Sequence, residues 1–163
     1  MRASHLIATF GGVGLLRPAP GTWGSLAALP VAWLLLVLGG LPLLLIGIFL
    51  AIASGIWATQ VETKGKSDKD PGEIVIDEVA GQWIALLPVA VGAAHAGAAW
   101  LALWPGWIAA FVLFRLFDIW KPGPVGWADR RGGATGVMLD DVIAGLFAAL
   151  CTGVLGALWH AIA

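Results

Sequence analysis

The stretch from residue 25 to residue 59, SLAALPVAWLLLVLGGLPLLLIGIFLAIASGIWAT, decides the fold because it contains no Asp, Glu, Lys or Arg. A membrane-spanning helix needs about 20 mostly apolar residues, so this stretch is long enough for two crossings. Two glycines and Pro42 interrupt it near its middle, where these residue types favour a turn. We therefore expect a tight hairpin of two spanning helices, Ser25–Leu38 and Leu41–Thr59.

Three further apolar segments follow, and the composition agrees with a membrane protein. The chain of 163 residues is 60% hydrophobic and 12% charged, with a mean hydropathy of +0.90, whereas soluble domains are about 45–50% apolar. The further segments are expected over 79–94, 98–117 and 142–163, with kinks at Pro88 and Pro105. The prediction is an all-α polytopic membrane bundle of about five spans. The segment 79–94 could instead dip into the membrane and return, which would leave four spans.

The chain is expected to form one integral-membrane domain over 1–163. Residues 1–20 are interpreted as an amphipathic lead-in, because prolines stop them from joining the first span. The charged segment 60–76 is expected to be an aqueous linker, and 118–141 a loop that carries the active site. The only cysteine, Cys151, has no partner for a disulfide or for a cysteine metal site.

The charged residues follow the predicted topology closely. With five crossings and the amino terminus inside, all nine Lys and Arg and all ten Asp and Glu residues fall on one face of the membrane. Positive residues mark the cytoplasmic side of membrane proteins, so this face is predicted to be cytoplasmic. The net charge of −1 gives no indication of a nucleic-acid partner.

Two acidic pairs stand at the start of predicted spans, Asp77-Glu78 and Asp140-Asp141. Such pairs can simply cap a helix, but unpaired charge beside hydrocarbon is costly, which favours a bound counter-ion. The sequences DEVAG and DDVIAG also place small residues shortly after each pair, and small residues allow close helix packing. Packing through them would bring four carboxylates to one point, and Mg²⁺ prefers such oxygen ligands.

Two further motifs provide groups that bind phosphate. In Pro20–Ser25, PGTWGS, either Thr22 or Ser25 could cap the first span and leave backbone N–H groups free for an anion. Basic residues are interleaved with acids at the end of the fourth segment and after it, and guanidinium groups suit phosphate oxygens. Carboxylates, Mg²⁺ and a cationic clamp together indicate phosphoryl transfer. The alternative is a network of salt bridges with lipid headgroups.

Three motifs together resemble the bacterial phosphatidylglycerophosphatase A family: PGTWGS, DEVAGQW and FRLFDIWKPGPVGWADRRGGATGVMLDDVIAG, at residues 20–25, 77–83 and 114–145. The resemblance implies a Mg²⁺-dependent phosphatase of the bacterial inner membrane. Its substrate would be the membrane phospholipid phosphatidylglycerophosphate, and its products phosphatidylglycerol and phosphate. Nothing in the sequence predicts the oligomeric state.

The residues expected to carry the chemistry fall into three sets. The catalytic set is Asp77, Glu78, Asp118, Asp129, Asp140 and Asp141. The metal ligands are expected among Asp77, Glu78, Asp140 and Asp141. The groups expected to bind the substrate phosphate are Arg115, Lys121, Arg130, Thr22 and Ser25.

The mechanism and two rival functions stay open at this point. Attack by a Mg²⁺-bound water with an Asp as base is preferred over attack by an Asp carboxylate. An ion or metal transporter is disfavoured because every acid lies near the end of a span, whereas transport sites lie near the middle of the membrane. A phosphatidyltransferase is disfavoured because its signature of Asp-Gly followed closely by Ala-Arg is missing.

Overall fold

The computed structural model describes residues 2–68 and 70–162, and no strand occurs among them. The prediction of an all-α fold is therefore confirmed. The elements are α1 (Ala3–Ala8), η1 (Val13–Leu15), α2 (Pro20–Glu62), α3 (Ile76–Ala85), α4 (Leu87–His95), α5 (Trp104–Trp120), α6 (Pro124–Asp129) and α7 (Gly133–Ile162).

Helix α2 is a helical hairpin, as the sequence predicts. Gly40 has φ 63° and ψ −157°, which interrupts the helix and reverses the chain. The two halves pack tightly, because a Cβ atom added to Gly47 would lie 2.9 Å from Cδ1 of Leu35. The first half begins at Pro20 rather than at Ser25, since proline is well suited to the first turn of a helix.

Within the described part of the chain, three stretches are long and apolar enough to cross a membrane: Pro20–Glu62, Ile76–His95 and Gly133–Ile162. In their most apolar windows, 72% of the residues of Ile76–His95 are buried, against 22% for each of the other two. The α3–α4 stretch therefore lies at the centre of the bundle, while α2 and α7 expose large apolar side chains such as Phe49 and Leu150. This arrangement is that of a membrane protein, because such surfaces require a lipid environment.

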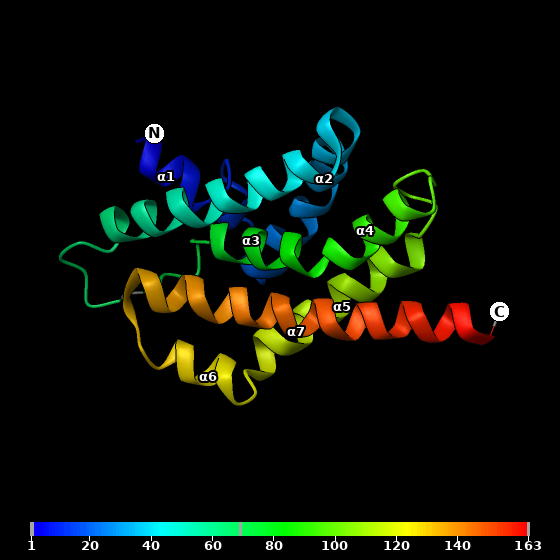
Figure 1. Cartoon of the computed structure of the whole chain (residues 1–163). Coiled ribbons are helices and arrows are strands. Elements are labelled where there is room, and N and C mark those ends of the chain that lie inside the picture. The colour runs from blue at the N-terminus through cyan, green and yellow to red at the C-terminus, as the bar shows by residue number, and fades with distance from the viewer. Residues whose placement is uncertain (1, 69, 163) are drawn as a thin grey trace.

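Figure 1 shows α3 and α7 side by side and running in the same direction, and the two helices pack against each other. The chain termini lie at opposite ends of the bundle. The charged linker, α6 and the first turns of α3 and α7 gather at the end near the amino terminus. Parallel packing of α3 and α7 thus places both acidic pairs at the same end.

The predicted boundaries are wrong in two places. Helix α5 starts at Trp104 rather than near residue 98, because Pro105 begins this helix instead of kinking it. Helix α7 starts at Gly133, so Asp140 and Asp141 lie about two turns inside it rather than at its first turn. The break expected at Pro88 is confirmed, because α3 ends at Ala85 and Pro88 stands in the first turn of α4.

Two segments expected to be irregular are partly helical. Residues 118–141 are not one loop, because they contain the end of α5, all of α6 and the start of α7. The linker is shorter than 60–76, since α2 continues to Glu62. The lead-in is held against this end of α2, where the Ser4 hydroxyl donates a hydrogen bond of 2.6 Å to Glu62.

Candidate metal centre and phosphate site

The site is built around the point where α3 crosses α7. A Cβ atom on Gly145 would collide with the carbonyl oxygen of Gly81, and one on Gly81 would lie 2.6 Å from the Asp141 carbonyl oxygen. Only glycine permits such a close approach of two backbones. The predicted packing through Ala80-Gly81 and Ala144-Gly145 is therefore confirmed. Asp77 and Asp141 each stand four residues before the glycine of their own helix, so both side chains lie near this crossing.

Three carboxyl groups meet there, Asp77, Glu78 and Asp141, which we call the carboxylate triad. Each of them offers an oxygen atom within 4.8 Å of the others. Asp77 is 6% exposed and Asp141 3% exposed. Oδ1 of Asp77 and Oε2 of Glu78 are buried and have no hydrogen-bond partner among the described residues.

The carboxylate triad fits a divalent cation. Like charges this close disfavour ionisation unless a positive charge lies nearby, and a buried unpaired carboxylate is strongly destabilising. The buried oxygens without partners are the hard donors that Mg²⁺ or a similar cation takes as ligands. The geometry therefore supports a metal centre in the carboxylate triad.

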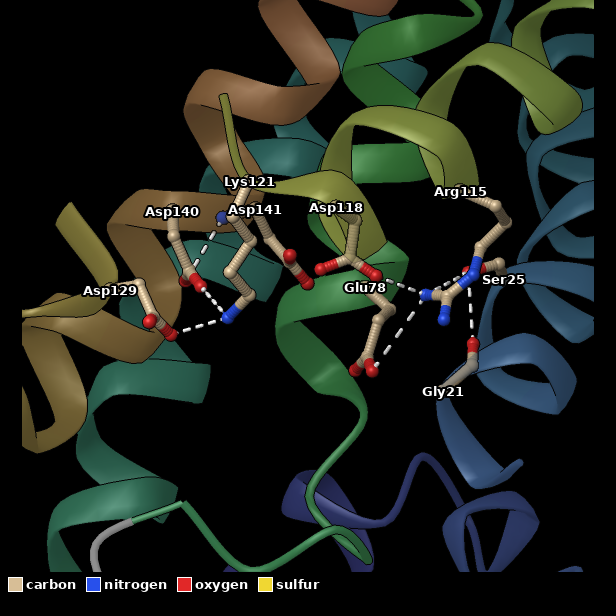
Figure 2. A network of polar contacts seen from close by, with 9 residues as sticks. All are labelled: Gly21, Ser25, Glu78, Arg115, Asp118, Lys121, Asp129, Asp140 and Asp141. Atoms are coloured by element: carbon tan, nitrogen blue, oxygen red, sulfur yellow. Dashed lines mark hydrogen bonds and ion pairs between the residues drawn. The ribbon is translucent and has the colours of Figure 1, made fainter. Parts of the chain in front are cut away.

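A second cluster, the lysine bridge, consists of Lys121, Asp129 and Asp140. The Lys121 ammonium donates a hydrogen bond of 2.8 Å to Oδ2 of Asp140 and another to Oδ1 of Asp129, as Figure 2 shows. Partial burial disfavours the charged ammonium, but the hydrogen bonds to both acids raise the pKa of Lys121 above its ordinary value. The lysine bridge therefore contains one cation that pairs with both of its acids.

Asp140 does not belong to the carboxylate triad, although it was expected among the metal ligands. Neighbouring residues on an α-helix point about 100° apart, so Asp141 faces the crossing with α3 while Asp140 faces Lys121. Asp129, expected in a supporting role, lies on α6 and contacts the site through Lys121.

Arg115 connects the carboxylate triad to α2. Its Nη1 atom lies 2.5 Å from Oδ2 of Asp118 and 4.0 Å from Oε1 of Glu78, and it donates a hydrogen bond of 3.4 Å to the Ser25 hydroxyl. Figure 2 shows the guanidinium group extended between these groups. A Cβ atom on Gly21 would collide with Oε1 of Glu78, so the glycine of the PGTWGS motif makes room for this carboxylate.

The capping roles expected for Thr22 and Ser25 are wrong. Ala19 occupies the N-cap position of α2, and among the described residues no side chain forms a capping hydrogen bond at this end. Ser25 is fully buried inside the helix and donates a hydrogen bond of 2.9 Å to the Gly21 carbonyl. Its hydroxyl instead helps to hold Arg115 in place. Thr22 lies in the first turn and is half-buried.

Arg130 lies at the edge of the site. It is exposed, and the salt bridges found among residues 2–68 and 70–162 do not include it. The neighbouring Arg131 packs on the ring of Trp127, with 4.1 Å between the guanidinium carbon and the ring centroid.

Gln82 is a residue that the sequence reasoning did not identify. It is fully buried one turn after Glu78, and neither atom of its amide has a hydrogen-bond partner among the described residues. A buried amide without partners is costly, which is typical of functional positions. The sequence could have indicated Gln82, because it is the one polar side chain in the apolar run that follows the acidic pair of the DEVAGQW motif.

Comparisons with known proteins agree with this geometry. The family model described as phosphatidylglycerophosphatase A matches residues 6–156. A phosphatidylglycerophosphatase A of Escherichia coli is 37% identical over 157 residues, which cover 95% of this chain and 84% of that protein. The corresponding protein of Haemophilus influenzae is 40% identical over 147 residues, which cover 90% of this chain and 84% of that protein.

A third relative carries a different name. A protein of Bacteroides thetaiotaomicron, named as a proposed phosphatidylinositol-3-phosphatase, is 38% identical over 147 residues, covering 87% of this chain and 86% of that protein. No solved structure gave a significant match. The family model spans nearly the whole chain, and the relatives match it over most of their length. The chain therefore belongs to the phosphatidylglycerophosphatase A family.

Proposed function

We propose that this protein is a Mg²⁺-dependent lipid phosphatase that hydrolyses phosphatidylglycerophosphate to phosphatidylglycerol and phosphate. The observation that carries the proposal is the carboxylate triad, which has two buried oxygens without partners among the described residues and which contacts Arg115 through the other oxygen of Glu78. A cation site next to a guanidinium group is suited to a phosphomonoester. Membership of the family supports the choice of substrate.

The chain's own residues divide the work between binding and proton transfer. Asp77, Glu78 and Asp141 would hold the metal, and Arg115 would bind the phosphate oxygens. Asp118 holds Arg115 in place through their ion pair of 2.5 Å. When bound, Mg²⁺ polarises the phosphoryl group and lowers the pKa of water. A carboxylate of this cluster acts as the general base that takes a proton from the attacking water. We prefer this route over direct attack of a carboxylate on phosphorus, which would form a covalent carboxyl phosphate.

Lys121 is the second phosphate-binding group. Its side chain is 31% exposed and lies between two helices that carry acids, which keeps it charged and oriented. Substrate phosphate can compete with the exposed Asp129 for this ammonium group. Arg130 and Thr22 lie further out and would contact the headgroup only at the rim of the site.

The substrate class is tested by phosphate release from vesicles that contain the purified protein. We expect turnover of phosphatidylglycerophosphate that is lost after chelation of divalent cations and restored by Mg²⁺. A parallel assay with phosphatidylinositol 3-phosphate measures how strictly the headgroup is recognised. Absence of Mg²⁺-dependent release from both lipids would overturn the proposal.

We also propose that the chain crosses the membrane five times and that the site faces the cytoplasm. The hairpin of α2 supports two crossings, and α3–α4 and α7 support one each. Helix α5, with 17 residues, reaches the lower limit of about 17–25 for a span. All Lys and Arg residues fall on one face in the five-span topology predicted from the sequence, which supports the orientation.

Cysteine labelling in intact cells tests the orientation, with Cys151 replaced by Ser. We expect a membrane-impermeant thiol probe to label His95→Cys but neither Lys66→Cys nor Arg131→Cys. Labelling of position 66 or 131 before cell lysis would show that the orientation is wrong.

A further inference from the structure

We infer that an apolar groove on α7 binds an acyl chain of the lipid phosphate, an inference that rests on the proposed function. This acyl groove has a volume of about 730 Å³ and lies between Pro88 of α4 and the face of α7 that runs from Ile143 to Ala157. Every side chain that lines it is apolar. The acyl groove could therefore accept a hydrocarbon chain but no polar ligand.

The acyl groove begins beside the phosphate site. Its first residue, Ile143, comes three positions after Asp140, which binds Lys121. Phe147 of the groove packs edge-on against Phe117, with ring centroids 5.7 Å apart, and Phe117 directly precedes Asp118. The groove thus lies next to the parts of α5 and α7 whose acids, Asp118 and Asp140, pair with Arg115 and Lys121.

The acyl groove is long enough for the part of a lipid chain that lies in one leaflet. From Ile143 to Ala157 the helix rises by about 21 Å, while the hydrocarbon of one leaflet is about half of the 30 Å core. An acyl chain lying along α7 could therefore contact the open groove throughout its leaflet, with its phosphate at the level of Lys121. An anionic phosphate joined to a hydrocarbon chain is the chemistry that both parts together would recognise.

Small residues create the space in the groove. Ala149, Gly153 and Ala157 lie along it, and a Cβ atom on Gly153 would stand 3.6 Å from Cβ of Pro88. Gly156, on another face of the same helix, does not line the groove, and its Cβ would meet no atom within 4 Å. Since bulk lipid is as apolar as the groove, binding there gains little from the hydrophobic effect. The groove would act by orienting the phosphate.

The test fills the groove and compares substrates of different chain length. We expect Ala149→Phe and Gly153→Leu to lower kcat/KM for dipalmitoyl phosphatidylglycerophosphate by about tenfold, because a misplaced headgroup reacts slowly. Turnover of the dihexanoyl lipid, whose chains end above these positions, should stay close to that of the wild type. Gly156→Leu is the matched control and should leave both substrates unaffected. Thermal unfolding in detergent checks that each variant is folded.

A second measurement uses a dipalmitoyl substrate with a diazirine near the end of one chain. We expect cross-links within residues 143–157 that unlabelled substrate suppresses. Cross-links that unlabelled substrate does not suppress would indicate bulk lipid and overturn the inference. It would also be overturned if the groove variants changed the oligomeric state and left the chain-length dependence intact, because the groove would then bind a second copy.

Failure of the inference is distinguishable from failure of the proposed function. If the wild-type protein hydrolyses neither the dipalmitoyl nor the dihexanoyl phosphatidylglycerophosphate, the proposed function fails and the inference falls with it. If the wild type hydrolyses both of these substrates and the groove variants have the same kcat/KM values as Gly156→Leu, only the acyl groove is wrong.

Discussion

The carboxylate triad and the lysine bridge lie side by side, contain acids of adjacent sequence position, and differ in charge balance. Asp140 receives a hydrogen bond from Lys121, whereas the carboxylate triad has buried oxygens without any partner among the described residues. Figure 2 shows their members Asp140 and Asp141 next to each other in the site. Lys121 donates hydrogen bonds to both acids of the lysine bridge, whereas the cation nearest the carboxylate triad, Arg115, lies 4.0 Å from Glu78 and pairs more closely with Asp118. The lysine bridge can therefore be structural, while the carboxylate triad has room for a bound cation.

This comparison predicts that two adjacent aspartates differ strongly in how much activity their replacement costs, and it contains the largest expected effect. Asp141→Asn should lower Mg²⁺-dependent phosphate release by about a thousandfold, because a catalytic metal contributes several kcal/mol. Asp140→Asn should lower it only about tenfold, since Lys121 keeps its contact with Asp129. Kinetics on both purified variants measure this difference. Equal losses at the two positions would show that the metal site is misplaced.

Arg115 belongs to the side of the carboxylate triad, and its removal should have the next largest effect. Arg115→Ala should reduce kcat/KM by about a hundredfold, because loss of one partner of a buried ion pair costs about 3–5 kcal/mol and part of this falls on stability. Arg115→Lys should restore little, since lysine cannot contact Asp118 and Ser25 with one planar group. Arg131→Ala, in the exposed turn between α6 and α7, is the control and should retain normal kinetics.

The crossing of α3 and α7 holds the two parts of the carboxylate triad together, so widening it should separate them. A methyl group on Gly145 would meet the Gly81 backbone, and overpacking of this kind costs about 1–3 kcal/mol. Gly145→Ala should therefore lower both the unfolding temperature in detergent and the activity. The same change at Gly156, where a Cβ meets open space, should do neither. Normal activity of Gly145→Ala would argue that the close contact does not position the acids.

The lysine bridge should show the smallest effect at the site. Lys121→Ala should raise KM by about tenfold, because the substrate phosphate loses one cationic contact. The effect stays small because the ammonium is partly exposed, and an ion pair near solvent is worth about 1 kcal/mol or less. Lys64→Ala and Asp68→Asn, in the exposed linker, should change kcat and KM by less than about twofold. Similar effects at Lys121 and Lys64 would indicate a diffuse basic surface rather than a phosphate site.

Local patterns were sufficient to predict most of the architecture. The apolar tract around Gly40 predicted the hairpin, and the small residues after each acidic pair predicted the α3–α7 crossing. Helix starts were harder to predict. The run from Gly133 to Leu139 contains no proline, and α7 continues through Gly136, so the helix begins earlier than the acids suggested. Pro105 was interpreted as a kink, although proline equally begins a helix.

The sequence by itself determined that this chain is a helical membrane protein, that its charges gather at one end, and to which family it belongs. Hydropathy and charge are properties of each residue and its neighbours, so no tertiary contact is needed to read them. Only the tertiary structure decided that Asp141 joins Asp77 and Glu78 while Asp140 joins Lys121, and that Ser25 holds Arg115. These pairings depend on the rotation of each helix about its axis. The close contact of Gly81 with Gly145 sets that rotation, and it exists only once the helices have packed.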